Sequence, residues 1–200
     1  IGCRLKSTRL PNKALLTIGG IASIERCISN CNLLNRVDII VLATSNLSSD
    51  DALEKFDGRG ANLFRGDPDD VIRRYVDAAH HYEIDHIIRV TGDCPAVSPE
   101  ICDVLLKSHL EKGADYSATD DCSVGLACEI YSTASLSRVL EYFKVAKHAE
   151  YMTWYLRKNP HMFNINLVSM NYFTEKRYRL TLDYEEDLMM FNELFQKLDN

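Results

Sequence analysis

The feature that most constrains the fold is an alternation of strand-like and helix-like segments along the chain. Residues 38–43 form a continuous apolar run of strand length, and apolar residues recur at helical spacing over 21–34. An unbroken apolar strand is typical of a sheet that is covered on both faces. Strands separated by helices therefore predict an α/β fold, with a Rossmann-like mixed, mostly parallel sheet flanked by helices.

The remaining elements are predicted from the same alternation and from helix-start signals. Asp67 with Pro68 predicts the start of one helix, and Ser98 predicts another, which ends at Gly113. Residues 1–3 are interpreted as the end of a first strand whose beginning is absent from this chain. Further strands are predicted at 62–64, 86–91, 128–131, 164–170 and 177–182, and further helices from 49, at 133–143, at 147–158 and at 184–198.

Charge and cysteine usage exclude some classes of function. The chain has 200 residues, which fit a single domain, 1–200, and its formal net charge is −6. Broad nucleic-acid binding needs a basic surface, so we expect no nucleic-acid partner. The cysteines are scattered without metal-ligand spacing, which favours a reduced, cytoplasmic setting. No apolar run reaches membrane-spanning length and no signal peptide is recognisable, so we expect no membrane association.

The loop that follows the first strand end has a high density of cations. Residues 4–13 contain Arg4, Lys6, Arg9 and Lys13, together with two hydroxyl side chains. A basic loop at a strand end suits a triphosphate, because arginine binds phosphate oxygens in a bidentate way and lysine acts as a point charge. From charge alone, a solvated surface loop explains the pattern equally well.

Two aspartates follow later strands and are candidate metal ligands. Asp93 comes after the predicted strand 86–91, and Asp183 comes after 177–182. Because the carboxyl ends of parallel strands share one rim, the two carboxylates and the basic loop are expected to meet there. Mg²⁺ prefers a few carboxylates together with water and phosphate oxygens. Alternatively, Asp93 is a turn former and Asp183 is a helix cap, which is a common position for aspartate.

The order of these residues resembles a known family. The string R-x-x-S-T-R-L-P-x-K at 4–13 is similar to the signature of the cytidylyltransferases that activate 3-deoxy-sugar acids and acylneuraminates, and still more to their spore-coat polysaccharide F-like branch. The similarity continues, in the family's order, at 42–45, 64–71, 89–95 and 179–188. It implies the fold of nucleotide-diphospho-sugar transferases and a homodimer, with an acceptor or dimerisation subregion near 120–175.

The resemblance also implies roles for individual residues. The catalytic set consists of Arg9, Lys13, Asp93 and Asp183, and the two aspartates hold Mg²⁺. The residues that contact the nucleotide and its phosphates are Arg4, Ser7, Arg9, Lys13, Arg65 and Asp93. The residues that contact the acceptor are Glu129 and Glu150.

These features predict an enzyme that moves CMP from CTP to a sugar or sugar acid and releases pyrophosphate, for surface polysaccharide or glycoconjugate synthesis. A glycosyltransferase of similar fold is one alternative, but such enzymes typically hold their metal with a D-x-D pair, and residues 92–95 contain one aspartate. A non-catalytic relative is the other alternative. It is suggested by the absent start of the first strand and by Tyr151, where the family usually has histidine, whereas Asn12 in place of glycine is a mild departure.

Overall fold

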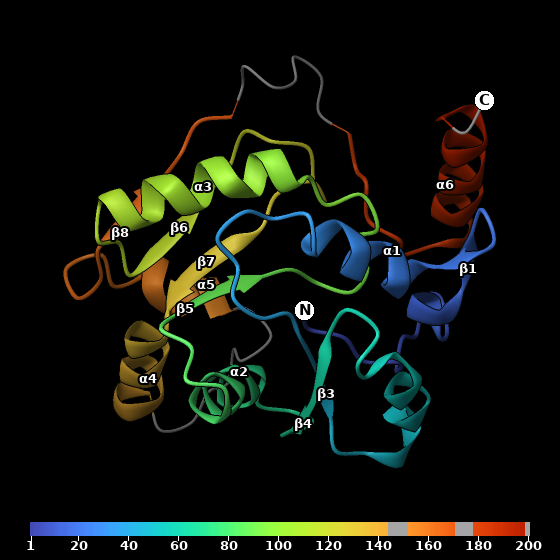
Figure 1. Ribbon diagram of the computed structural model, residues 1–200. Coiled ribbons are helices and arrows are strands. Elements are labelled where there is room, and N and C mark those ends of the chain that lie inside the picture. The colour runs from blue at the N-terminus through green and yellow to red at the C-terminus, as the bar shows by residue number, and fades with distance from the viewer. Residues whose placement is uncertain (144–151, 171–177, 199–200) are drawn as a thin grey trace.

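The computed structural model describes residues 1–143, 152–170 and 178–198 (Figure 1). The helices are α1 (Ser23–Cys31), α2 (Val71–His81), α3 (Pro99–Glu111), α4 (Thr133–Tyr142), α5 (Met152–Arg157) and α6 (Glu185–Leu198), with short 3-10 segments η1 (Lys13–Leu15) and η2 (Ser48–Phe56). The strands are β1 (Thr17–Ile18), β2 (Ile21–Ala22), β3 (Val41–Ser45), β4 (Asn62–Gly66), β5 (His86–Arg89), β6 (Tyr116–Ala118), β7 (Glu129–Ser132) and β8 (Ile165–Leu167).

A central mixed sheet is assembled around the first residues of the chain. β3 pairs with β4 in parallel, and a second group has the order β5-β7-β6-β8. Gly2 joins the two groups, because it forms parallel bridges with both Ala43 and Thr91. β7 runs antiparallel to its neighbours β5 and β6, whereas β6 and β8 are parallel. The predicted α/β class with a mixed sheet is confirmed.

Helices cover both faces of this sheet. The apolar side chains of α1 and α3 form one buried cluster with the sheet, and those of α2, α4 and α5 form another on the opposite face (Figure 1). On α1, Ile24, Cys27, Ile28 and Cys31 are buried at the predicted helical spacing, which explains why this segment is helical and which side it turns inward. Among the described residues, no helix is long and apolar enough to cross a membrane.

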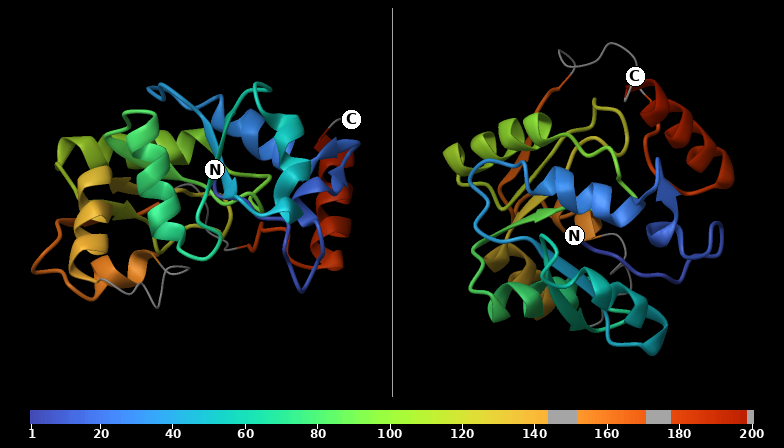
Figure 2. Two further views of the ribbon diagram at one scale, coloured as in Figure 1. Left: turned by 90° about the horizontal axis from the view of Figure 1, so that it is seen from below. Right: turned by 45° about the vertical axis from the view of Figure 1, so that its right-hand side comes forward.

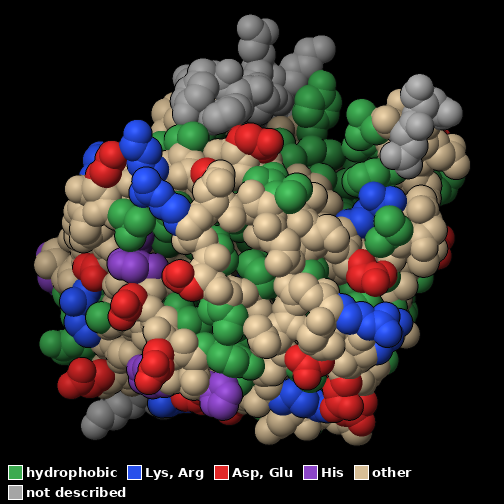
Figure 3. All heavy atoms as spheres, viewed as in Figure 1, with side chains coloured by type: hydrophobic (Ala, Val, Ile, Leu, Met, Phe, Trp, Pro, Cys, Tyr) green, Lys and Arg blue, Asp and Glu red, His purple; other side chains and the backbone are tan. Residues whose placement is uncertain are grey.

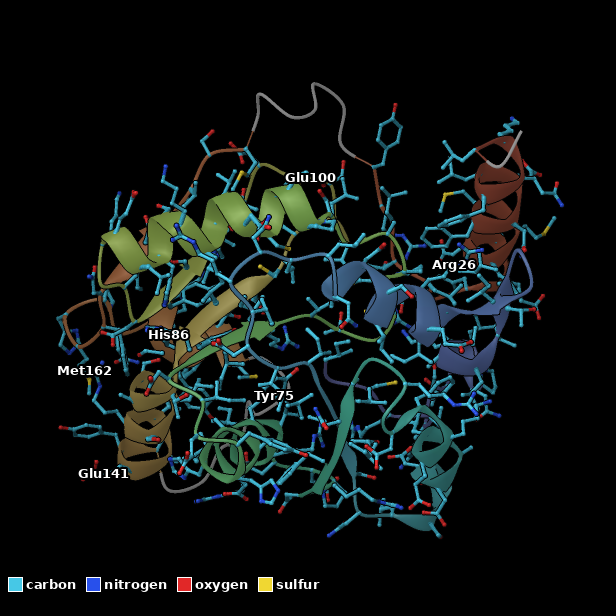
Figure 4. All side chains as sticks on the ribbon, viewed as in Figure 1. Arg26, Tyr75, His86, Glu100, Glu141 and Met162 are labelled. Atoms are coloured by element: carbon cyan, nitrogen blue, oxygen red, sulfur yellow. The ribbon has the colours of Figure 1, made fainter. Side chains whose placement is uncertain are left out.

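The C-terminal helix α6 lies at the opposite end of the molecule from α4 (Figure 2). Its Phe191 is fully buried in a small cluster with Leu10, Ile18 and Leu182. Arg26 of α1 also holds this corner together, since its guanidinium lies 3.9 Å from the ring centroid of Phe195 and its Nε donates to the Ile18 carbonyl at 2.8 Å (Figure 4). The cluster therefore brings the basic loop and the segment before α6 to the same place.

Two predicted boundaries are wrong for identifiable reasons. Asp67 does not cap a helix, because its Oδ1 accepts hydrogen bonds at 2.8 Å from the backbone N–H groups of Asp69 and Asp70, which closes a turn. α2 begins at Val71, and Asp70 is its cap. The predicted strand 38–43 begins at 41 instead, opposite the first residue of its partner β4.

Other predicted segments are shorter or different from the prediction. Within the described part of 177–182, pairing is limited to one isolated bridge between Arg179 and Val124. The helix predicted from residue 49 is a 3-10 segment, and the described part of 147–158 contains the short helix α5. The strand β6 was not predicted, because a buried serine, Ser117, interrupts its apolar character.

Candidate active site

The two candidate metal ligands and a lysine of the basic loop meet at one rim of the sheet. Lys13 Nζ donates to Asp93 Oδ2 at 2.6 Å and to Asp183 Oδ1 at 2.8 Å. The backbone reinforces this approach, since the N–H of Leu182 donates to the Asp93 carbonyl at 2.8 Å. We call Lys13, Asp93 and Asp183 the carboxylate–lysine cluster. It forms although the segment before Asp183 is not a regular strand.

Asp183 has the largest number of hydrogen bonds in this cluster. Its Oδ1 also accepts from Arg9 at 2.7 Å, and its Oδ2 accepts from Thr181 Oγ1 at 3.1 Å and from Arg179 at 3.2 Å. The Arg9 side chain is half-exposed and lies 5.3 Å from the ring centroid of Tyr184. Donors from the basic loop and from its own segment therefore hold the Asp183 carboxylate in place.

Asp187, in the first turn of α6, fixes the backbone that carries Asp183. Its Oδ2 accepts hydrogen bonds from the N–H groups of Asp183 at 2.8 Å and Tyr184 at 2.9 Å, and its Oδ1 pairs with Arg179. A carboxylate in the first turn that reaches back to the N–H groups before the helix forms the carboxylate half of a capping box. A negative charge in the first turn also interacts favourably with the helix dipole. Asp187 thus combines this position with an ion pair and two backbone contacts.

The charges of the cluster are strongly coupled. Burial disfavours the ionised form of Asp93, but the Lys13 ammonium beside it outweighs burial, so the pKa of Asp93 lies below its ordinary value. Burial likewise lowers the pKa of Lys13, but Asp93 and Asp183 outweigh that effect and the pKa is raised. Asp93 and Lys13 are therefore ionised at neutral pH, and the Lys13 ammonium lies within hydrogen-bond distance of both carboxylates.

The carboxylates of Asp93 and Asp183 are suitable ligands for a magnesium ion that also contacts phosphate. Two carboxylates within hydrogen-bond distance of one nitrogen offer a few hard oxygen ligands, and Mg²⁺ usually completes its coordination with water and phosphate oxygens. In the part of the chain that the structure describes, no group of three or more His, Cys, Asp or Glu side chains is arranged to hold a metal by itself. A metal held here would therefore depend on the nucleotide for further ligands.

A cleft of about 530 Å³ opens beside the cluster. Its wall includes Asp93 and six cationic side chains: Arg4, Lys6, Arg9, Lys13, Arg74 and Arg89. A second cavity of about 330 Å³ is lined mainly by apolar residues near the amino ends of β3 and β5, and it lacks this concentration of cations. The space-filling view in Figure 3 shows acidic and basic side chains interspersed on the outer face that it presents. The cationic cleft is thus suited to a polyanion.

Arg74 and Arg89 were not singled out from the sequence. Arg74 lies on α2 beside the buried face of that helix, where its side chain is buried and donates to the Asp67 carbonyl at 2.7 Å. Tyr75, the next residue, lies between α2 and the sheet (Figure 4). An arginine next to the apolar positions of a helix is the signal that could have identified Arg74, since a charge is rarely buried without a reason.

The other predicted nucleotide contacts are placed differently. Arg4 lines the cleft and donates to the Pro68 carbonyl, and Ser7 Oγ accepts from the N–H of Leu10 at 3.3 Å within the basic loop. Arg65 is not among the residues that line the cleft. Its guanidinium pairs instead with Glu54 and, at 2.7 Å, with Asp51.

Glu129 lies in a second group of charged and polar side chains, the Glu129 cluster (Arg89, Tyr116, Glu129, Tyr131). Arg89 of β5 is directly opposite Glu129 of β7 and pairs with its Oε2. The same carboxylate accepts from Tyr131 at 3.1 Å and from Tyr116 at 2.9 Å. Burial, together with the nearby Glu129 charge, raises the pKa of both tyrosines. Glu150, the other predicted acceptor contact, lies outside the described residues, as does Tyr151.

Comparisons with known proteins show the family of this chain. The family model described as cytidylyltransferase matches residues 1–199. The spore coat polysaccharide biosynthesis protein SpsF of Bacillus subtilis is 31% identical over 204 residues, which cover 98% of this chain and 85% of that protein.

Solved structures share the fold. A cytidylyltransferase from Leptospira borgpetersenii has a TM-score of 0.85 at 24% identity, covering 99% of this chain and 92% of that one. A CMP:2-keto-3-deoxy-manno-octonic acid synthetase complexed with CTP has a TM-score of 0.74 at 17% identity, covering 98% and 97%. At these identities, the likeness shows the fold.

Proposed function

This chain belongs to the cytidylyltransferase family, and from that membership we propose that it transfers CMP from CTP to a sugar or sugar acid and releases pyrophosphate. The observation that carries the proposal is the carboxylate–lysine cluster beside a cleft lined by cations. The Bacillus subtilis relative is named for polysaccharide synthesis, and the CTP-bound fold neighbour is named for a 3-deoxy sugar acid. Both names support an acceptor of this kind and a role in surface polysaccharide or glycoconjugate synthesis.

The basic loop is the proposed binding site for the triphosphate. Arg4, Arg9 and Lys13 line the cleft from this loop, and Ser7 lies within it. Arg9 and Lys13 form ion pairs with the two aspartates. Phosphate oxygens can replace these partners, because a half-exposed arginine and a lysine on a flexible stem reorient at modest cost.

The chemistry is an in-line displacement at the α-phosphorus. The acceptor hydroxyl oxygen forms a bond to phosphorus, the bond to the bridging oxygen breaks, pyrophosphate leaves with the electron pair, and the hydroxyl proton passes to solvent. A magnesium ion held by Asp93 and Asp183 would neutralise charge on the phosphate and orient the leaving group. Arg9 and Lys13 stabilise the negative charge that collects on the departing pyrophosphate.

The acceptor is proposed to lie toward Glu129 and Glu150. An ionised carboxylate has about four acceptor positions. Three donors occupy Glu129, so its carboxylate retains capacity for an acceptor hydroxyl.

We further propose a homodimer formed through the region near 120–175, where Tyr142 and Trp154 are exposed. A concentration-independent monomer mass in solution scattering would contradict the dimer.

The seven cysteines form no disulfide, which supports a proposed reducing, cytoplasmic location.

The decisive experiment measures pyrophosphate release with each of the four ribonucleoside triphosphates and Mg²⁺, across a panel of sugar acids, amino sugars and neutral sugars. We expect release with CTP that depends on one class of acceptor. Activity with a purine triphosphate alone would overturn the cytidylyl assignment. Consumption of a nucleotide-sugar without pyrophosphate release would instead indicate a glycosyltransferase.

A further inference from the structure

Asp50 is a buried carboxylate for which the proposed chemistry has no use. It lies in η2, just after β3, and is 1% exposed. Its Oδ1 accepts a hydrogen bond of 2.7 Å from the backbone N–H of Leu5, and its Oδ2 accepts from the hydroxyl of Ser45. Among the described residues, no cation forms an ion pair with it. Burying a carboxylate without a cation is costly, and its two hydrogen bonds must offset that cost.

One part of this arrangement is local turn chemistry. Ser45 Oγ also accepts from the N–H of Leu47, and the N–H of Asp50 donates to the Leu47 carbonyl at 3.0 Å. These bonds close the turn between β3 and η2. The bond to Leu5 is different, because it reaches 45 positions along the chain and contributes nothing to that turn.

Leu5 is at the root of the basic loop. The last sheet-like bond of the first segment is made by Cys3, whose N–H donates to the Ala43 carbonyl at 3.1 Å. Two residues later the Asp50 carboxylate holds the N–H of Leu5, between the cleft-lining cations Arg4 and Lys6. Asp50 therefore fixes the point from which the loop leaves the sheet and enters the cleft.

Arg65 fixes η2 from the other side. Its guanidinium donates to the carbonyl groups of Ser45 at 3.1 Å and Leu47 at 2.7 Å, in addition to pairing with Asp51 and Glu54. All of these partners belong to the turn or to η2 itself. A continuous set of contacts thus runs from β4, through Arg65 and η2, to Asp50 and the loop root.

We propose that Asp50 is a positioning residue that sets the course of the basic loop and thereby the affinity for the nucleotide triphosphate. This inference rests on the proposed function, since it takes the loop to bind CTP. The hydrogen-bond acceptor at position 50 is the essential feature. Removing it allows the loop root to shift, and displacements of about 1 Å at a binding site have large effects.

The test compares Asp50→Leu with Asp50→Asn. Leucine has a similar size and removes both acceptors. Asparagine keeps an oxygen for the Leu5 N–H and can donate to Ser45 Oγ. The readouts are the Kd for CTP with Mg²⁺, measured by calorimetry without acceptor, and the KM for CTP in pyrophosphate release. We expect Asp50→Leu to weaken CTP binding and raise the KM by at least about tenfold, and Asp50→Asn to remain within about threefold of the unsubstituted chain.

Asp115→Asn is the matched control. Asp115 is partly buried and, like Asp50, accepts several hydrogen bonds: it pairs with Arg138 at 2.7 Å and accepts from the Asn164 N–H at 2.9 Å. It lies before β6 and away from the basic loop. We expect this variant to lower the melting temperature without changing the Kd for CTP. A merely structural role of Asp50 would give the same result for Asp50→Leu.

Several outcomes would overturn the proposal. Folded Asp50→Leu that binds CTP normally would show that the loop does not need this anchor. Equal losses in Asp50→Leu and Asp50→Asn would assign the effect to charge rather than to the hydrogen bond. If Asp50→Leu does not fold, Ser45→Ala, which removes the donor to Oδ2, should weaken CTP binding by a few fold, and unchanged binding would reject the proposal.

The same measurements separate this proposal from the proposed function. Binding of CTP by the unsubstituted chain without pyrophosphate release, whatever the acceptor, would reject the enzymatic function but leave the comparison at position 50 valid. No binding of any nucleoside triphosphate would overturn both together.

Discussion

The carboxylate–lysine cluster and the Glu129 cluster both pair a cation with a carboxylate, but they are built in different ways. Lys13, Asp93 and Asp183 come from a loop, a turn and the approach to a helix. Arg89, Glu129, Tyr116 and Tyr131 come from the adjacent strands β5, β6 and β7, and the register places Arg89 opposite Glu129. The first cluster can exchange partners, whereas the strand ladder holds the second in one arrangement.

This difference separates two uses of charge in one molecule. In the carboxylate–lysine cluster, the cation that neutralises the aspartates is the same one proposed to bind phosphate, so ligand binding exchanges one set of ion pairs for another. In the Glu129 cluster, three protein donors hold the carboxylate in place, and their loss would leave a partly buried charge without its protein partners. Substitutions in the first should mainly affect activity, and those in the second should mainly affect folding.

Asp183→Asn should have the largest effect on activity. The variant removes a negative charge that receives four hydrogen bonds and is the proposed metal ligand. We expect pyrophosphate release to fall by at least about a hundredfold, while the melting temperature changes little. The exposed neighbour Glu186→Gln is the control and should retain activity. Unchanged turnover in Asp183→Asn would remove this residue from the metal site.

Glu129→Ala should have the largest effect on stability. It leaves the partly buried guanidinium of Arg89 without its carboxylate and removes the acceptor of two tyrosine hydroxyl groups. We expect a loss of about 2–4 kcal/mol in the free energy of unfolding, measured by urea denaturation. A double variant with Arg89→Met should recover part of the loss, because it removes the unpaired charge. A loss below about 0.5 kcal/mol would mean that the cluster is not a structural unit.

The meeting of Asp93 and Asp183 could be predicted from the sequence because it follows from a topological rule. The rule is that the carboxyl ends of parallel strands lie at one rim of the sheet, and each aspartate follows a segment that ends there. The rule holds even though residues 178–182 form one isolated bridge rather than a strand. The signature of the basic loop likewise identified Lys13. Local sequence order is sufficient in these cases, because position along a strand determines position on the rim.

The Glu129 cluster and the Asp50 anchor could not be predicted in this way. Both depend on contacts between segments whose register is decided by the whole sheet: the antiparallel placement of β7 between β5 and β6, and the passage of Leu5 beside η2. Arg65 is a further example. The family resemblance predicts that it contacts the nucleotide, which stays a prediction, whereas its ion pairs with Asp51 and Glu54 of η2 were not predicted from the sequence.

Lys13→Met tests how strongly the charges of the carboxylate–lysine cluster are coupled. The pKa of Asp93 is lowered in the folded chain, so its stabilising contribution is complete above the unfolded pKa of about 4 and is lost as the pH falls through the lower folded pKa. Removing Lys13 leaves two facing carboxylates and raises that pKa. We expect the variant to lose about 1 kcal/mol of stability at pH 7 and to lose less than the unsubstituted chain on acidification. Melting temperatures from pH 7 to pH 3 measure both changes, and parallel curves would contradict the coupling.

Asp187→Ser should have the smallest effect. It tests whether the carboxylate–lysine cluster needs the backbone contacts that Asp187 makes. A serine in the first turn is too short to hold the N–H groups of both Asp183 and Tyr184 or to pair with Arg179. We expect a loss of about 1 kcal/mol in stability, as for a lost helix cap, and a fall of several fold in pyrophosphate release because the Asp183 backbone is less well fixed. Asp187→Asn keeps one acceptor for these N–H groups and should retain more of both properties. If Asp187→Ser loses stability but keeps full activity, the capping interaction is purely structural. The carboxylate–lysine cluster is then positioned by its own side-chain contacts alone.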